Sequence, residues 1–147
     1  MALVDESEDA RAIRTLIGAH FRGLRWSSAT RPDWGVFTAD FLPDASLFPA
    51  ARPMRRQTLD AFVTRMNGLA QGALRSFEET TLGMQIHVFG NVAVVLAASE
   101  MVENGSAVNQ DVSGYLLLKD EGAWRIAAHA WDHASEHSPV PEHLRHA

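Results

Sequence analysis

The hydrophobic pattern of this sequence changes its period once, close to Gly72. Before this point apolar residues recur every three or four positions, which is the repeat of an amphipathic helix. After it, apolar and more polar residues alternate, as in the run from Leu82 to Val88, which is the repeat of a strand with one covered face. Helices followed by a run of strands predict an α+β domain in which the helices cover one face of a sheet.

Three helices and one short strand are predicted in the first half. Acidic residues at positions 5–9 precede the first helix, where they suit the helix dipole. Pro32 begins a short second helix, Ala45 to Phe48 form a short strand, and positions 50–56 are read as an exposed loop with three arginines. Thr58 caps the third helix. The apolar stripe of the first helix consists of Ile13, Leu16, Ile17, His20, Phe21 and Leu24.

Turn signals divide the second half into a four-strand meander. Hairpin turns are predicted at Gly90-Asn91, at Asn104-Gly105 and at Glu121-Gly122. Glycines inside strands mark bends or bulges, so we expect one at Gly83 and one at Gly114. Residues 1–134 are therefore predicted to form a single domain, and residues 135–147, with two prolines and no periodicity, an irregular and loose C-terminal tail.

Composition narrows the classes of protein that remain. The chain has 147 residues, a formal net charge of -5 and no cysteine. The acidic balance argues against nucleic acid as a partner, and the missing cysteines exclude disulfides and thiolate chemistry. The N-terminus is acidic where a signal peptide would be basic, and no apolar run is long enough for a membrane span. We therefore expect a cytoplasmic protein that binds no membrane.

Two segments of the meander and one before it resemble a known family. They are Val88-Phe89-Gly90-Asn91-Val92-Ala93-Val94-Val95, then Gly122-Ala123-Trp124-Arg125-Ile126-Ala127-Ala128-His129, and the stretch from Phe37 to Ser46 with Asp44-Ala45. The pattern resembles the nuclear transport factor 2-like superfamily, and more narrowly its bacterial SnoaL-like branch, over residues 8–134. The resemblance implies a cone-shaped fold: a bent antiparallel sheet with three helices on its concave face. The superfamily includes isomerases, polyketide cyclases, dehydratases, epoxide hydrolases and non-catalytic domains, so a shared fold does not choose the function.

The sequence departs from the ketosteroid isomerases of that superfamily at each of their reactive positions. The general-base aspartate would fall at Pro49, and the carboxylic acid that stabilises the oxyanion would fall at Gly114. The tyrosine of the first helix has no counterpart, because the one tyrosine, Tyr115, belongs to a strand. The isomerase mechanism is therefore not expected here.

The last hairpin supplies the leading site prediction. With its tip at Glu121-Gly122, an unbroken register places Gly114 opposite His129 and leaves open space beside the imidazole. His129 and Trp131 then share the face that corresponds to the pocket in the resembling isomerases. His129 is the predicted acid or base and Trp131 a ligand-binding residue. The alternative is that His129 is a hydrogen-bonded core histidine and Trp131 ordinary packing.

Five further residues are candidates for the site. His20 lies on the apolar stripe of the first helix and is either a second acid or base or a satisfied core group. Glu100 ends a strand and is either a buried base or an exposed carboxylate. The choice depends on the pairing register of that strand, because a shift of one residue moves every side chain to the other face. Residues His87, Trp34 and Gly114 complete the predicted ligand-binding set.

No metal or cofactor site is predicted. His129 and His133 are four residues apart, which on a strand places them about 13 Å apart at ~3.3 Å per residue, too far to share one ion. Phosphate-loop, nucleotide-binding and serine-nucleophile motifs are absent from the sequence.

Two classes of function remain open at this stage. One is a small enzyme that applies acid–base chemistry of the cyclase, isomerase or dehydratase type to a hydrophobic, oxygen-bearing small molecule. The other is a ligand-binding or assembly module without turnover. Two or more titratable side chains converging in one pocket would favour the enzyme.

A homodimer through the convex face of the sheet is also predicted. If the helices cover the side with His129 and Trp131, the opposite side keeps an apolar patch that a monomer would leave exposed. The unbroken register assigns to this patch Tyr115, Leu117, Trp124, Ile126, Ala128 and Ala130.

Overall fold

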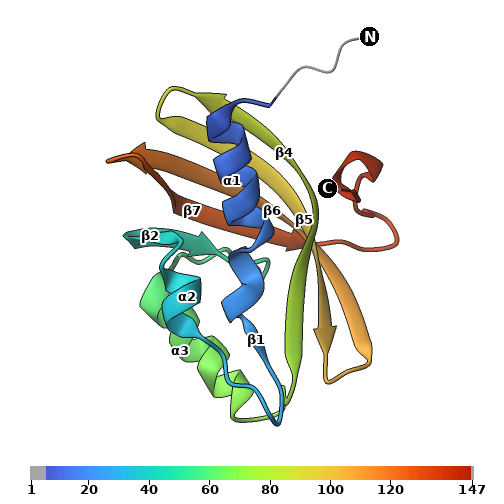
Figure 1. The fold of residues 1–147 in the computed structure, drawn as a ribbon. Helices are drawn as coiled ribbons and strands as arrows, with labels where there is room; N and C mark the ends of the chain where they lie inside the picture. The colour runs from blue at the N-terminus through green and yellow to red at the C-terminus, as the bar shows by residue number, and fades with distance from the viewer. Residues whose placement is uncertain (1–5, 147) are drawn as a thin grey trace.

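The computed structural model describes residues 6–146, which form a strongly curled sheet wrapped around helices (Figure 1). The sheet has seven strands in the order β1-β4-β5-β6-β7-β2-β3. Its bounds are β1 Arg25–Trp26, β2 Phe41–Phe48, β3 Gln57–Thr58, β4 Phe77–Phe89, β5 Val92–Glu103, β6 Ala107–Asp120 and β7 Ala123–His133. The helices are α1 Glu8–Gly18, α2 Trp34–Thr38 and α3 Leu59–Ala70, with 3-10 turns η1 His20–Gly23 and η2 Glu142–Leu144. None of these helices is both long and apolar enough to cross a membrane.

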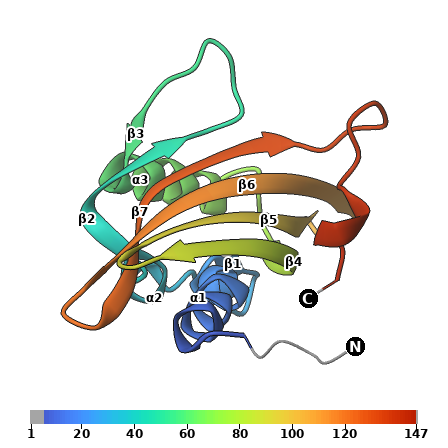
Figure 2. The same ribbon diagram turned by 90° about the horizontal axis from the view of Figure 1, so that it is seen from above.

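The predicted class and meander are confirmed. β4, β5, β6 and β7 pair antiparallel in chain order. All three helices lie on the concave side, as the view from above shows (Figure 2). The sheet as a whole is mixed, because β2 pairs with β7 in parallel, an arrangement that the antiparallel prediction did not contain. The pairing of β2 is interrupted between Phe41 and Ser46, around Pro43, which has no N–H to donate.

The predicted start of α3 agrees with the structure, whereas α1 ends earlier than predicted. Thr58 caps α3 by accepting a bond from the Ala61 N–H at 3.1 Å, as expected for an N-cap threonine. α1 ends at Gly18, and the chain tightens into η1, so that His20 and Phe21 sit in a separate turn rather than on the predicted long helix. The predicted cap at Thr58 was local, whereas the end of α1 depends on packing against the sheet.

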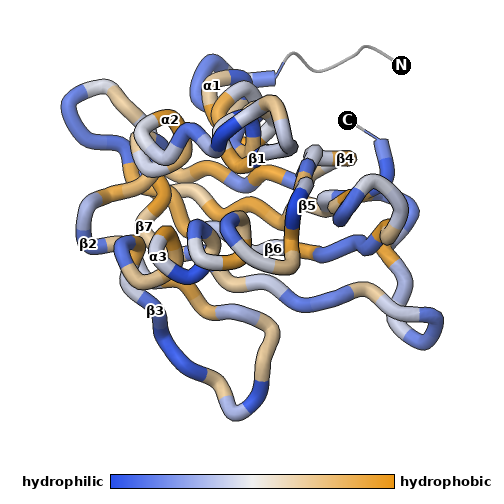
Figure 3. Tube along the Cα trace, turned by 90° about the horizontal axis from the view of Figure 1, so that it is seen from below, coloured by the Kyte–Doolittle hydropathy of each residue, from blue (hydrophilic) through white to orange (hydrophobic). Residues whose placement is uncertain are grey.

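The core lies between the helices and the concave face of the sheet. Its completely buried side chains include Ile13 and Ile17 of α1, Leu117 of β6 and Ile126 of β7. The central strands are mostly hydrophobic, whereas the loop between β2 and β3 projects from the body of the molecule and mixes hydrophilic with hydrophobic residues (Figure 3). This loop contains the three arginines at positions 52, 55 and 56, all exposed, as predicted.

The C-terminal segment packs against the outer face of the sheet. Val140 and Leu144 are buried with Ala98 of β5 in a second, smaller cluster. Gly83 lies beside the predicted bulge of β4 and allows this close approach: a Cβ there would stand 2.6 Å from the His146 carbonyl oxygen and 2.7 Å from that of Leu144. Segment 135–146 therefore packs as part of the domain, although it is irregular apart from η2.

We predict that Gly83→Ala destabilises the protein by about 1–3 kcal/mol, the usual cost of forcing atoms into a packed site. Gly114→Ala is the matched control, because no atom lies within 4 Å of a Cβ at that position. Alanine is less flexible than glycine in the unfolded chain, so this control should be neutral or slightly stabilising. Urea unfolding of the two variants measures the difference. Equal stability of both would show that the C-terminal segment does not press on Gly83.

Candidate functional site

A small cavity opens inside the cone, between α3, η1 and the concave face of β4 to β7. Its volume is about 130 Å³. A cavity of roughly this size holds one benzene ring. One part of the wall is apolar and comprises Phe21, Leu24, Phe62, Met66, Phe77 and Met101. The polar part comprises Arg65, Glu79, Asp111, Ser113, His129 and His133, with Trp131 beside them.

Glu79 of β4 faces this cavity from one wall. Its Oε2 accepts a hydrogen bond of 2.7 Å from the hydroxyl of Ser99 on the neighbouring strand β5. Burial raises the pKa of the Glu79 carboxyl to about 8, since the charged form loses its water, and the nearby charge of Asp111 adds to the rise. The bond from Ser99 opposes the rise without cancelling it. Glu79 is therefore held largely protonated at neutral pH.

Asp111 of β6 carries a second carboxylate on the same wall. Its Oδ1 lies 2.6 Å from Nδ1 of His133, which stands directly opposite on β7. The Asp111 side chain is 6% exposed and that of His133 is 68% exposed, so the pair connects the cavity to solvent. Burial raises the pKa of Asp111 above its ordinary value, and the hydrogen bond from His133 opposes this rise without cancelling it. The two carboxyls therefore differ in their hydrogen-bond partners: Glu79 is bonded to a hydroxyl, and Asp111 is bonded to an imidazole.

His129 of β7 contributes an uncharged imidazole. Its Nε2 lies 2.8 Å from the Ser113 hydroxyl, and its ring stacks on Tyr115 with centroids 4.3 Å apart. Its Nδ1 is buried and has no hydrogen-bond partner among the described residues. Burial holds the pKa of His129 well below its ordinary value, and the neighbouring His20 lowers it further. The imidazole is therefore neutral at pH 7 and suits hydrogen bonding better than proton storage.

His20 lies behind the cavity rather than in its wall. It is fully buried, its Nδ1 lies 2.9 Å from Oδ2 of Asp40, and its ring stacks on Phe37. Its ring centroid is 6.3 Å from that of His129, so the two imidazoles are neighbours. Burial lowers the pKa of His20, while the bond to Asp40 raises it. Only one of its ring nitrogens is satisfied, since Nε2 is buried and has no hydrogen-bond partner among the described residues.

The predicted register of the last hairpin is wrong beyond its first pairs. Ala127 is an extra, unpaired residue of β7, because Leu117 pairs with Ile126 and Leu116 with Ala128. His129 therefore stands opposite Tyr115, and the open space at Gly114 lies on the opposite face of the sheet from the imidazole. His129 and Trp131 nonetheless share the concave face and both line the cavity, as the wrong register had also predicted.

Four predicted residues lie elsewhere. Glu100 faces the convex side, where its Oε1 accepts a hydrogen bond from Gln110, so it cannot reach the cavity. His87 and Gly114 also face the convex side and line a shallow hollow there. Trp34 is half-buried, donates from Nε1 to Asn67 at 3.3 Å and lines a different depression. The expected set thus divides between the two faces of the sheet.

Sequence reasoning missed Glu79, Asp111 and Ser113. A signal was present: Asp111, Ser113 and Tyr115 alternate along one strand as His129, Trp131 and His133 do along the next. Polar residues at alternate positions inside a long strand share one face. The bulge at Ala127 is what brings these two rows of side chains onto the same face of the sheet. The alternation within each strand does not predict where a bulge occurs.

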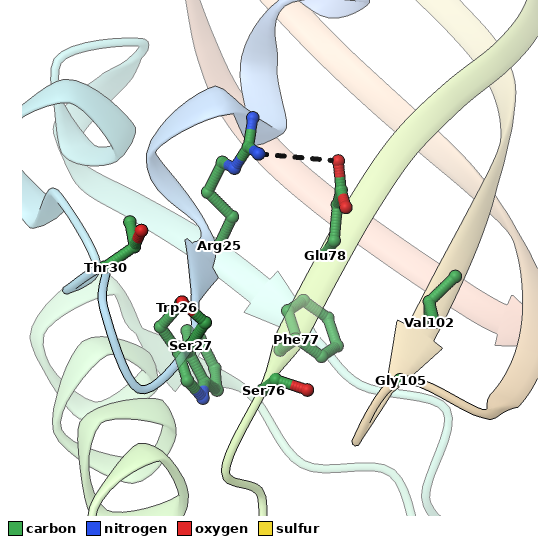
Figure 4. Close-up of a pocket in the computed structure, with 9 residues that line it drawn as sticks. All are labelled: Arg25, Trp26, Ser27, Thr30, Ser76, Phe77, Glu78, Val102 and Gly105. Carbon is green, nitrogen blue, oxygen red and sulfur yellow. Dashed lines mark ion pairs between the residues drawn. The ribbon is translucent and has the colours of Figure 1, made fainter.

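A second hollow, of about 170 Å³, lies at the β1 edge of the sheet (Figure 4). Two charged side chains line it, and they pair with one another: Arg25 and Glu78, 3.8 Å apart and each about half exposed. Their charges offset one another at the surface, where an ion pair of this kind contributes little to stability. Within residues 6–146, no group of three or more His, Asp or Glu side chains is close enough to hold a metal ion.

Comparisons with known proteins place the fold and leave the chemistry open. No family model matches the sequence, and no curated protein matches it. Solved structures do match. A nuclear transport factor 2-like protein of unknown function from Shewanella baltica is 14% identical with a TM-score of 0.64, over 91% of this chain and 100% of the other. The chain therefore has the cone fold of the nuclear transport factor 2-like class.

Two further neighbours have the same fold. A protein of unknown function with a cystatin-like fold from Nostoc punctiforme is 11% identical, with a TM-score of 0.68, over 90% of this chain and 97% of the other. A scytalone dehydratase-like protein from Novosphingobium aromaticivorans is 14% identical, with a TM-score of 0.67, over 86% and 85% of the two chains. Likeness at this level of identity defines the architecture alone.

The pKa of Glu79 predicts a pH dependence of stability. The pKa of the Glu79 carboxyl is 4.5 in the unfolded chain and about 8 in the folded protein. The unfolded chain therefore binds fewer protons in this window, so the contribution of Glu79 to stability is complete below it and is lost as pH rises through it. Glu79→Gln keeps an uncharged side chain, so its stability relative to the wild type should increase with pH.

Urea unfolding across that window measures this difference. Glu78→Gln is the matched control, because Glu78 is the adjacent residue on the opposite face and is 52% exposed. Its curve should run parallel to that of the wild type. Parallel curves for Glu79→Gln as well would show that the cavity does not desolvate the Glu79 carboxyl.

Proposed function

We propose that the protein is a small acid–base enzyme that acts on a single-ring, oxygen-bearing hydrophobic molecule bound in the cone cavity. One observation carries the proposal: Glu79, Asp111 and His129 line the same small cavity, and its remaining wall is mostly apolar. Acid–base catalysis requires one titratable group that is protonated and a second that is ionised at the same pH, and different environments within one site provide this.

The two carboxyls divide the work in a reaction of the dehydratase type. Ionised Asp111 takes a proton from a substrate carbon, and protonated Glu79 gives one to the departing hydroxyl, which leaves as water while a double bond forms. His133 then passes the proton of Asp111 to solvent, because its ring is exposed and bonded to that carboxylate, and Glu79 takes up a proton from solvent before the next turnover. Isomerisation or cyclisation needs the same acid and base without loss of water.

His129 and Ser113 suit a different role from the proton transfer predicted for His129. A neutral imidazole with an unpartnered Nδ1, beside a hydroxyl, offers hydrogen bonds that orient a substrate oxygen. Trp131 lies 4.8 Å from the His129 ring and supplies a flat surface for a ring substrate. A dehydratase-type reaction also agrees with the name of the scytalone dehydratase-like neighbour.

Turnover tests this proposal. Cyclic hydroxyketones and cyclic alcohols are first screened for binding by ligand-observed NMR, and binders are then incubated with enzyme and examined by mass spectrometry for loss of water or by NMR for a moved double bond. Glu79→Gln and Asp111→Asn should each reduce the rate by at least ~100-fold, the usual range for losing a general acid or base. Glu78→Gln should leave it unchanged. Binding without any turnover in the wild type would favour a binding module instead.

We also propose a homodimer through the convex face, with a corrected set of residues. Tyr115, Leu117, Trp124 and Ile126 belong to the buried core, because the bulge at Ala127 turns them inward. The outer face instead exposes Val94, Leu96 and Leu116, each by 38–49%. Val94 pairs with Leu116, and Leu96 with Gly114, so the apolar ridge borders the hollow that Gly114 leaves open.

A second copy of this chain is the occupant that fits such a surface. No Asp, Glu, Lys or Arg belongs to the residues that line the hollow, and a two-fold contact sets the ridge of one protomer into the hollow of the other. Light scattering should give about twice the chain mass of 16.2 kDa. Leu116→Glu should return the chain mass, since it buries a charge at the contact.

Leu69→Glu is the control for this prediction. Leu69 is 42% exposed on α3, on the helical side of the molecule. It should leave the measured mass unchanged. A wild type with the mass of one chain at micromolar concentration would exclude the dimer.

A further inference from the structure

Arg65 stands on the rim of the cone cavity. It belongs to the same turn of α3 as Phe62 and Met66, and all three line the cavity. Its guanidinium carbon is 5.5 Å from the centre of the Phe62 ring, a cation–π distance. The side chain remains exposed while its end lies against an aromatic wall. The positive charge is thus directed along the entrance rather than into open solvent.

This guanidinium has no acidic partner within residues 6–146. Other arginines do: Arg14 bonds Glu6, and Arg25 lies 3.8 Å from Glu78. Partial burial lowers the pKa of Arg65 from its ordinary value, and no carboxylate offsets this effect. An arginine left partly desolvated and without a partner beside a cavity is available to a ligand.

We infer that the ligand of the cavity is a cyclic or aromatic carboxylate, whose ring packs against the wall formed by Phe62 and Trp131 and whose carboxylate is bound by Arg65 at the rim. The planar fork of arginine matches a carboxylate with two parallel hydrogen bonds. Asp111 also lines the cavity, and its carboxylate, ionised in the proposed reaction, would repel an anion placed beside it, so the charged end of the ligand stays at Arg65. This inference rests on the proposed function, since it names the substrate class of the same cavity.

Binding of three simple probes tests the inference without any need for turnover. Benzoate, benzyl alcohol and benzylamine share one ring and differ in the charge of their substituent. The wild type should bind benzoate about tenfold or more tightly than benzyl alcohol, as expected for a charge-assisted bidentate contact. Arg65→Gln should remove this preference and leave the affinity for benzyl alcohol unchanged. Arg55→Gln, in the exposed loop between β2 and β3, should behave as the wild type.

Methyl-labelled methionine locates the bound probe. Met66 and Met101 line the cavity, whereas Met54 is 65% exposed in the loop between β2 and β3. Benzoate should shift the methyl signals of Met66 and Met101 and leave that of Met54 in place. These variants are solvent-accessible at the changed position, so folding should survive, and the methyl spectrum of each variant checks it.

Three results would overturn the inference. They are a benzoate preference that survives Arg65→Gln, tighter binding of benzylamine than of benzoate, and benzoate shifts that do not involve Met66 and Met101. Tighter binding of benzylamine would assign the recognition to Glu79 and Asp111 instead. Arg65-dependent benzoate binding without turnover of any substrate would reject the proposed enzyme and keep the anion site, so the two failures are distinguishable.

Discussion

The pairing of β6 with β7 decides which residues of this protein face the interior. Ala127 is bulged out of the ladder between Ile126 and Ala128. Because side chains alternate across a strand, one extra residue inverts every position beyond it. Trp124 and Ile126 on one side of the bulge, and His129 on the other, therefore all point toward the helices. Without the bulge, the strand could fill either the apolar core or the polar part of the cavity wall, but not both.

Curvature of the sheet then gives the interior two different environments. At the end occupied by α1, side chains such as Ile13, Ile17 and Leu117 fill the space completely. Toward the other end of the strands, polar side chains from β4, β6 and β7 converge around a cavity that protein atoms do not fill. Desolvation at that end raises the pKa of Glu79 and lowers that of His129, so each is held in its neutral form. Chemistry in the cavity depends on this incomplete filling.

The outer face of the same strands is covered by the C-terminal segment at one end and exposed farther along. At one end Val140 and Leu144 of the C-terminal segment cover Ala98, and Gly83 provides the room that they need. Farther along, Val94, Leu96 and Leu116 have no cover from their own chain. A single sheet therefore presents a closed end, an exposed apolar ridge and, on its other side, a polar-lined cavity. These three surfaces come from one set of alternating positions.

The sequence by itself determined the order of helices and strands, the three hairpins, the cap at Thr58 and the fold class, because period, turn residues and caps act within a few positions of the chain. It also indicated the cavity face of His129 and Trp131. Tertiary structure decided the parallel pairing of β2 with β7, the bulge at Ala127 and the packing of the C-terminal segment. Those decisions placed Glu79 and Asp111 in the cavity and moved Glu100, His87 and Gly114 to the outer face. The reason is physical: register depends on contacts between strands far apart in the chain, and a shift of one residue costs little locally while it exchanges the two faces of a strand.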